Sequence, residues 1–217
     1  MTSPPVGRRP RLPEPSEDGA GVDRRGLPHA VRRDALLDAA AELLSTGDVE
    51  SVSMEAVAER AGVSRPLVYK HFPNRSELLA ALYTRESGAL HRELASVVEA
   101  APTLEEMFRA LIKGLLRAQA SRGATTAALR SAGVRNDAHR QRQARRNQNT
   151  VSYFTDQAVA EFGLPRRQCR AAVAVALGAT EAVMNQWRLR PTSDYALVLQ
   201  EAYVALAMGG LERLARG

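Results

Sequence analysis

The sequence predicts an all-helical protein of about nine helices, divided between a small N-terminal part and a larger C-terminal part. From residue 33 onward, apolar residues recur at intervals of three and four, the spacing of one helix face. No stretch sustains the alternation of apolar and polar residues that indicates a half-buried strand. With 217 residues, 45% of them hydrophobic, the chain is long enough to bury such helices around cores.

The first 29 residues differ in composition from the rest of the chain. Six of the eleven prolines lie before residue 29, among Gly, Glu, Asp and Arg. Such a segment buries too little apolar surface to offset the entropy lost on ordering, so residues 1–29 are predicted to be a disordered, basic and proline-rich arm. The first helix follows from Arg33, where Leu36, Ala40 and Leu44 recur at helical spacing, and Gly47 is its stop signal.

The most informative stretch is SMEAVAERAGVSRPLVYKHFPNRSELL, residues 53–79. Ser53 is expected to cap a short helix whose Val57, Ala58 and Ala61 form a narrow apolar face. Gly62 then supplies the positive φ of a tight turn. The stretch thus begins with one short helix followed by a sharp turn.

A second short helix is predicted over residues 65–72, with Ser64 as its cap and Pro66 tolerated in the first turn. At 100° per residue, Val68 and Phe72 share one face, which is expected to meet the core. The other positions face outward: Pro66, Leu67 and Lys70 opposite the core, Arg65 and Tyr69 on one flank, and His71 on the other. Two helices joined by a three-residue turn containing Gly form a helix-turn-helix, which inserts its second helix into the major groove of DNA.

The remaining helices are placed by their breakers and caps. Asn74 with Glu77, and Thr103 with Glu106, each place a side-chain acceptor three residues before a Glu. The predicted helices cover residues 75–98, 103–121, 124–131, 137–162, 165–189 and 193–214.

The run AxxAGVSRPLVYKHFPNRSELL closely resembles the signature of the TetR family, over roughly residues 33–80. In that signature the turn reads AGVS, the recognition helix ends in Tyr-x-His-Phe, and a basic residue precedes the fourth helix. Pro66 stands where many members have Gly, and Arg75 where Lys is common. The resemblance implies a helix-turn-helix DNA-binding domain, assigned to residues 30–78, and a ligand-binding and dimerisation domain, assigned to residues 79–217.

The resemblance also implies roles at the DNA. Phosphate contacts are expected from Ser53, Tyr69, His71 and Arg75, and base contacts from Arg65, Pro66, Leu67 and Lys70, with Ser64 completing the set. As the alternative, Tyr69 and His71 are only amphipathic cover for the core. Arg24, Arg25, Arg32 and Arg33 either reach an adjacent groove or belong to a solvated tail.

For the C-terminal part, the resemblance implies a ligand cavity and a dimer interface formed by the last two long helices. The candidate interface residues follow the apolar stripes of these helices: Leu177, Thr180, Leu199, Ala202 and Leu206. The candidate ligand-binding residues are large or adaptable apolar residues: Phe108, Leu111, Leu115, Tyr153, Phe154, Met184 and Trp187. Plain core packing is the alternative for each of them.

Charge leaves the nature of the effector open. The formal net charge of +6 favours partners such as nucleic acid, although 28 of the 30 basic residues are arginine, which genome composition could also produce. The run Arg135, Arg140, Arg142, Arg145 and Arg146 suggests an acidic effector or, more simply, a solvated helix face. We expect a mostly apolar or aromatic effector, held by Phe108, Phe154 and Trp187.

Other classes of function find less support. A single cysteine, Cys169, excludes an intrachain disulfide and any multi-cysteine metal site, so no metal or cofactor is expected and the cytoplasm is the expected compartment. No nucleophile–base pair or phosphate-binding glycine loop is recognisable. We expect a ligand-responsive repressor that binds a palindromic operator as a homodimer; a ligand-independent helix-turn-helix protein and, more remotely, a helical enzyme are the alternatives.

Overall fold

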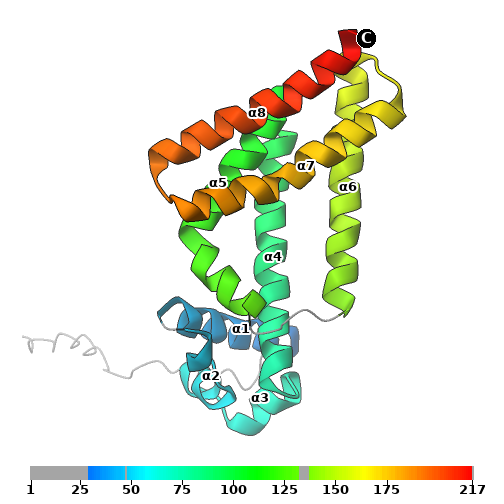
Figure 1. The fold of residues 1–217 in the computed structure, drawn as a ribbon. Helices are drawn as coiled ribbons and strands as arrows, with labels where there is room; N and C mark the ends of the chain where they lie inside the picture. The colour runs from blue at the N-terminus through cyan, green and yellow to red at the C-terminus, as the bar shows by residue number, and fades with distance from the viewer. Residues whose placement is uncertain (1–28, 47, 132–136, 217) are drawn as a thin grey trace, which may run out of the picture.

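The computed structural model describes residues 29–46, 48–131 and 137–216, and within these ranges the regular structure is entirely helical (Figure 1). The elements are α1 (His29–Thr46), the 3-10 helix η2 (Val49–Ser51), α2 (Met54–Ala61), α3 (Arg65–His71), α4 (Arg75–Glu99), α5 (Leu104–Ser131), α6 (Asp137–Phe162), α7 (Arg166–Leu189) and α8 (Ser193–Arg216). The predicted all-α class is therefore confirmed.

Two boundaries differ from the prediction. Helix α5 is continuous across Gly123, where a break between two helices was expected, so the described residues hold eight α-helices rather than nine. A single glycine costs a helix only about 1 kcal/mol relative to alanine, so it does not by itself end a helix. Helix α1 begins at His29, inside the expected arm, and residues 1–28 of that arm lie outside the described residues, as does Gly47.

The N-terminal core joins α1, α2, α3 and the first turns of α4. Leu37, Val57, Val68 and Leu79 are almost fully buried in it, as their apolar spacing predicts. Phe72, also buried, carries the guanidinium of Arg33 over its ring at 4.8 Å from the centroid, a cation–π contact between α3 and α1.

Helix α4 connects the two parts of the molecule (Figure 1). Its N-terminus is capped as expected, with Asn74 Oδ1 accepting a hydrogen bond of 2.9 Å from the Glu77 amide. Leu82, in its second turn, belongs to the N-terminal core, whereas Val98, near its end, belongs to the C-terminal core. One continuous helix thus spans both cores, and the domain boundary expected at residues 78 and 79 falls within it.

The C-terminal core contains an aromatic cluster contributed by three helices. The ring of Phe108 in α5 lies 5.0 Å from that of Phe154 in α6 and 6.0 Å from that of Tyr203 in α8, centroid to centroid. Tilted and edge-on pairs of this kind add to the stabilisation from burial. Helices α7 and α8 pack against each other and form the outer layer (Figure 1).

The single thiol provides a test of this core. Cys169 is fully buried, and burial raises the pKa of its thiol, so the reactive thiolate is scarce at neutral pH. The native protein should therefore react slowly, over hours, with 5,5′-dithiobis(2-nitrobenzoate), followed by absorbance, and rapidly once unfolded in guanidinium. Complete labelling of the native protein within seconds would contradict this packing of α7.

Candidate nucleic-acid interface and effector cavities

Helices α2 and α3 meet at the tight turn that the sequence predicts. Ser53 caps α2, because its hydroxyl oxygen accepts a hydrogen bond of 3.0 Å from the Ala56 amide. Gly62 ends α2 with φ at 65°, in the left-handed region that favours glycine. The Val63 amide then donates to the Ala58 carbonyl over 3.0 Å, which closes the turn. Ser64 occupies the cap position of α3, but its side chain makes no capping hydrogen bond, contrary to expectation.

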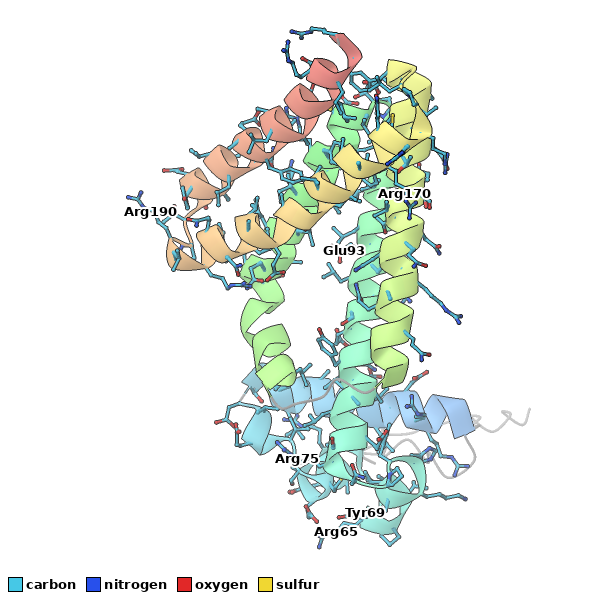
Figure 2. The ribbon with its side chains drawn as sticks, turned by 45° about the vertical axis from the view of Figure 1, so that its right-hand side comes forward. Arg65, Tyr69, Arg75, Glu93, Arg170 and Arg190 are labelled. Atoms are coloured by element: carbon cyan, nitrogen blue, oxygen red, sulfur yellow. The ribbon has the colours of Figure 1, made fainter. Side chains whose placement is uncertain are left out.

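Helix α3 presents its polar side chains to solvent at the end of the molecule remote from α7 and α8. Figure 2 shows Arg65 and Tyr69 projecting outward there. Pro66 and Lys70 are exposed as well, whereas Leu67 and His71 are half-buried. The residues predicted to face DNA from α3 therefore lie on one end of the molecule, with Leu67 and His71 less accessible than the others.

Arg65 has a neighbour that sequence reasoning did not identify. Its guanidinium forms an ion pair with the carboxylate of Glu55, in the first turn of α2. Both side chains are about half exposed. An exposed pair of this kind adds little stability, but it restrains the direction of the Arg65 side chain.

Arg75 points into the protein rather than into open solvent (Figure 2). Its Nε donates a hydrogen bond of 2.7 Å to the Val52 carbonyl, and its Nη2 donates to the Val49 carbonyl. The half-buried guanidinium thereby ties the start of α4 to η2 and to the residue that follows it. Its predicted phosphate contact stays a prediction, and the hydrogen bonds add a structural role that spacing along the sequence did not reveal.

The seven candidate ligand-binding residues do not gather around one cavity. Leu115 and Met184 line a cavity between α1, α4, α5 and α7, and Leu111, Tyr153 and Phe154 line another between α4, α5 and α6. Trp187 lines a third cleft between α5, α7 and α8, while Phe108 is core and lines none of these three cavities. Phe108, Phe154 and Trp187 do not meet at any of the three, because apolar spacing along a helix does not distinguish core from cavity wall, and their expected contact with one effector stays a prediction.

The cavity between α1, α4, α5 and α7 extends from the N-terminal core into the C-terminal part and has a volume of about 310 Å³. Leu44 of α1 and Leu129 of α5 line it from the N-terminal core, and Met184 of α7 lines it from the C-terminal core. Glu86 and Ser87 of α4 provide polar atoms in a mostly apolar lining. A cavity with this lining can hold a small apolar molecule that has one or two polar groups.

The cavity between α4, α5 and α6 has a volume of about 320 Å³ and includes His91 among its polar residues. Burial, followed by the charges of Arg146 and Arg92, holds the pKa of His91 below its usual value. Arg146 is half-buried against α4, where a Cβ placed on Gly88 would lie 3.2 Å from its Nη2. In the arginine run, Arg145 is exposed, as a solvated helix face requires, whereas Arg146 is half-buried. Arg135 and the side chains of Arg140 and Arg142 lie outside the described part of the chain.

The outer faces of α7 and α8 carry most of the exposed large apolar side chains. Of nine such side chains in the described residues, six belong to these helices: Val175, Leu189, Leu197, Val198, Leu206 and Leu214. Among the candidate interface residues, Ala202 and Leu206 are exposed, and Leu177, Thr180 and Leu199 are half-buried. The sequence stripes and these exposed side chains fall on the same two helices, while the dimer interface itself stays a prediction; Val175 and Val198 were not among the candidates because they fall outside those stripes.

The family model for bacterial regulatory proteins of the tetR family matches residues 36–82, the segment that folds into α1–α3 and the start of α4. Residues 36–82 thus match the N-terminal domain of the TetR family. This confirms the resemblance drawn from the AGVS turn and the Tyr-x-His-Phe ending, and the family is one of transcriptional regulators.

Curated relatives align with only part of the chain. The transcriptional activator FasR of Mycolicibacterium smegmatis is 43% identical over 68 residues, which cover 30% of this chain and 31% of FasR. The repressor KstR of Rhodococcus jostii is 46% identical over 55 residues, 25% of this chain and 26% of KstR. The regulator BetI of Rhizobium meliloti is 35% identical over 98 residues, 45% and 48% respectively. The chain thus aligns with between a quarter and a half of the length of these relatives.

Solved structures extend the likeness in fold to most of the chain. A TetR-like transcriptional regulator from a Rhodococcus species has a TM-score of 0.60 at 23% identity, over 86% of this chain and 98% of that one. The regulator FadR from Bacillus subtilis, solved in complex with stearoyl-CoA, has a TM-score of 0.59 at 17% identity, over 82% of this chain and 98% of the FadR chain.

Among the described helices, none is long and apolar enough to span a membrane.

Proposed function

We propose that this protein is a homodimeric transcriptional repressor that binds operator DNA through α3 and releases it when a small molecule occupies the cavity between α1, α4, α5 and α7. The observation that carries the proposal is this cavity, because its lining includes residues of the N-terminal core as well as of α7. A molecule bound there touches the elements that hold the recognition helix and those of the C-terminal bundle.

The exposed end of the helix-turn-helix supports the DNA-binding role. Arg65 can bridge O6 and N7 of guanine from the first turn of α3, and Pro66 or Leu67 can pack on a thymine methyl group. The exposed Tyr69 is suited to a phosphate contact, and the half-buried His71 is suited to another from the opposite flank of α3. Lys70 adds positive charge on the same outward-facing end.

We assign the effector to the cavity lined by Leu115 and Met184 because this cavity lies beside the helices that hold the recognition helix. Tyr83 and Glu86 belong to α4, which begins immediately after the recognition helix, and Leu44 belongs to α1. A ligand changes operator affinity only if it binds one conformation better than another. Filling a space between α4 and the end of α5 favours a conformation in which these helices are further apart.

The function is tested by selecting operator sequences from a random duplex library and measuring repression in a reporter strain. A dimer with twofold symmetry presents two recognition helices, so the selected sequence should be a near-palindrome with half-site centres about one helical turn, ~34–36 Å, or somewhat more apart. Removal of the protein should raise reporter expression. A fall in expression would instead identify an activator, and the absence of any selected sequence would refute sequence-specific binding.

Replacing Arg65 by alanine should relax one base preference and cost about 1–3 kcal/mol in affinity for the selected operator, because the bidentate contact is lost. Binding profiles from library selection and titrations at several salt concentrations measure both effects. Arg60→Ala is the matched control: it removes an exposed arginine from the neighbouring helix α2, and it should not change the profile. An unchanged profile with Arg65→Ala would show that this residue does not read bases.

Replacing Arg75 by alanine should lower the free energy of unfolding by about 1–3 kcal/mol, because two carbonyl acceptors lose charge-assisted donors. It should also weaken binding to all DNA sequences alike, since the start of α4 loses its tie to η2. Urea denaturation, together with operator titration, separates the two effects. Loss of DNA affinity at unchanged stability would instead indicate a direct phosphate contact.

A further inference from the structure

A cleft between α5, α7 and α8 has no part in the proposed regulatory function. Its volume is about 740 Å³, within the range of ~300–1,000 Å³ that is typical of small-molecule sites. Leu116 of α5, Trp187 of α7 and Leu197 of α8 provide apolar walls. It shares no lining residue with the cavity assigned to the effector.

Gln200 of α8 lines the cleft with a buried polar side chain. Its side chain is 9% exposed, and among the hydrogen bonds of the described residues none involves its amide group. The amide nitrogen and oxygen are not among the fully buried polar atoms without a partner, so they keep some contact with solvent, and a molecule in the cleft can reach them. A bound molecule with a polar group can therefore replace water at this amide.

The charge of the cleft has one sign. Lys113 and Arg117 are exposed, lie one turn apart on α5, and both line the cleft, whereas none of its lining residues is Asp or Glu. Neither cation forms one of the ion pairs found within the described ranges. The cleft therefore presents two cations, an indole ring and a buried amide to a common space.

We propose that this cleft is a second ligand site, which binds a small aromatic carboxylate. The ring packs on Trp187 and Leu116, the carboxylate lies between Lys113 and Arg117, and the amide of Gln200 hydrogen-bonds to a carboxylate oxygen. Trp187 thus acts as a ligand-binding residue, as its sequence context indicated, but without Phe108 or Phe154.

The experiment uses 3-phenylpropanoate as the probe and 3-phenylpropanamide as its neutral counterpart. Because Trp187 is the only tryptophan, its fluorescence reports on the cleft, and neither probe absorbs at the excitation wavelength of 295 nm used for tryptophan. We expect a saturable change with the carboxylate and about tenfold weaker binding of the amide, since the charge-assisted hydrogen bonds are lost. Isothermal titration calorimetry on the full chain provides an independent binding constant.

Two variants test the assigned roles. Arg117→Gln should weaken binding of the carboxylate about tenfold while leaving the amide unaffected. Gln200→Leu should weaken binding of both probes, since each loses a hydrogen bond to the amide, yet leave the thermal midpoint of the unliganded protein nearly unchanged, because the amide makes no hydrogen bond within the described residues. A residue retained only for packing would not combine these two effects.

Arg170→Gln is the matched control. Arg170 is an exposed cation near the start of α7, whereas the cleft lies at the other end of this helix, beside Arg190 (Figure 2). It lines none of the three cavities described above. Its replacement should leave both affinities within twofold.

Three outcomes would overturn the proposal: no saturable binding by either method, equal affinity for acid and amide, or the same loss with Arg170→Gln as with Arg117→Gln. No DNA is present in these measurements, so their result does not depend on whether the protein is a repressor.

Discussion

Replacing Leu206 by arginine should convert the protein from a dimer to a monomer at micromolar concentration. Leu206 is 79% exposed in the isolated chain and lies on α8 among the apolar side chains that include Val198 and, on α7, Val175. An unpaired charge buried in a dimer interface costs ~3–5 kcal/mol. Since each 1.4 kcal/mol is tenfold in an equilibrium constant, the dimer dissociation constant should rise about 100- to 4,000-fold.

Sedimentation velocity measures this change directly, because the wild-type protein should sediment near twice 23.6 kDa and the variant near the single-chain mass. Operator affinity should fall together with dimerisation, since the two recognition helices then bind independently. Val97→Arg is the matched control: Val97 is an exposed apolar residue on α4, outside α7 and α8, and its replacement should leave the dimer intact. A monomeric wild-type protein, or an unaffected Leu206→Arg dimer, would refute the proposed interface.

The sequence predicted the helices well because their signals are local. Asn74 caps α4 through a side chain three residues from the amide it binds, and Gly62 ends α2 by adopting a positive φ itself. The limits expected for residues 137–162 agree with those of α6 for the same reason. The break expected at Gly123 was wrong, since one glycine costs a helix only about 1 kcal/mol and does not by itself end it.

The candidate sites were harder to predict because they depend on contacts between elements distant in sequence. Nothing near Arg75 indicates that it binds carbonyls more than twenty residues earlier, and Glu55 has no feature that marks it as the partner of Arg65. Leu129 provides the clearest case. Its spacing predicts only a buried face, yet among the α5 side chains that the structure describes it is the one that joins the N-terminal core of α1–α4 rather than the C-terminal core.

Leu129 lies where the N-terminal core meets the proposed effector cavity. The side chain is 1% exposed within the N-terminal core, and it also lines the proposed effector cavity. Helix α5 also contacts η2, to which Arg75 ties the start of α4. The end of α5 is therefore a second connection, besides α4 itself, between the cavity and the recognition helix.

Filling the cavity by Ala118→Phe should act as a permanent ligand and lower operator affinity at least tenfold. Ala118 is a half-buried cavity residue of α5, and a phenyl group there forces α5 and α4 apart, which shifts the population away from the DNA-binding conformation. Fluorescence anisotropy with labelled operator measures the affinity. Ala120→Phe is the matched control, because it places the same side chain on an exposed position two residues further along α5, outside this cavity.

Adding Leu129→Ala to Ala118→Phe should recover most of the lost operator affinity. Without its side chain, the end of α5 no longer transmits the displacement to the N-terminal core, although the truncation itself lowers the free energy of unfolding by ~2–5 kcal/mol. Denaturation curves of each variant separate that loss from the coupling, and the double-mutant cycle isolates the interaction between the two positions. If the effects of the two substitutions on operator affinity are additive, α4 alone couples the cavity to the recognition helix. If Ala118→Phe leaves operator affinity unchanged, the cavity does not control DNA binding.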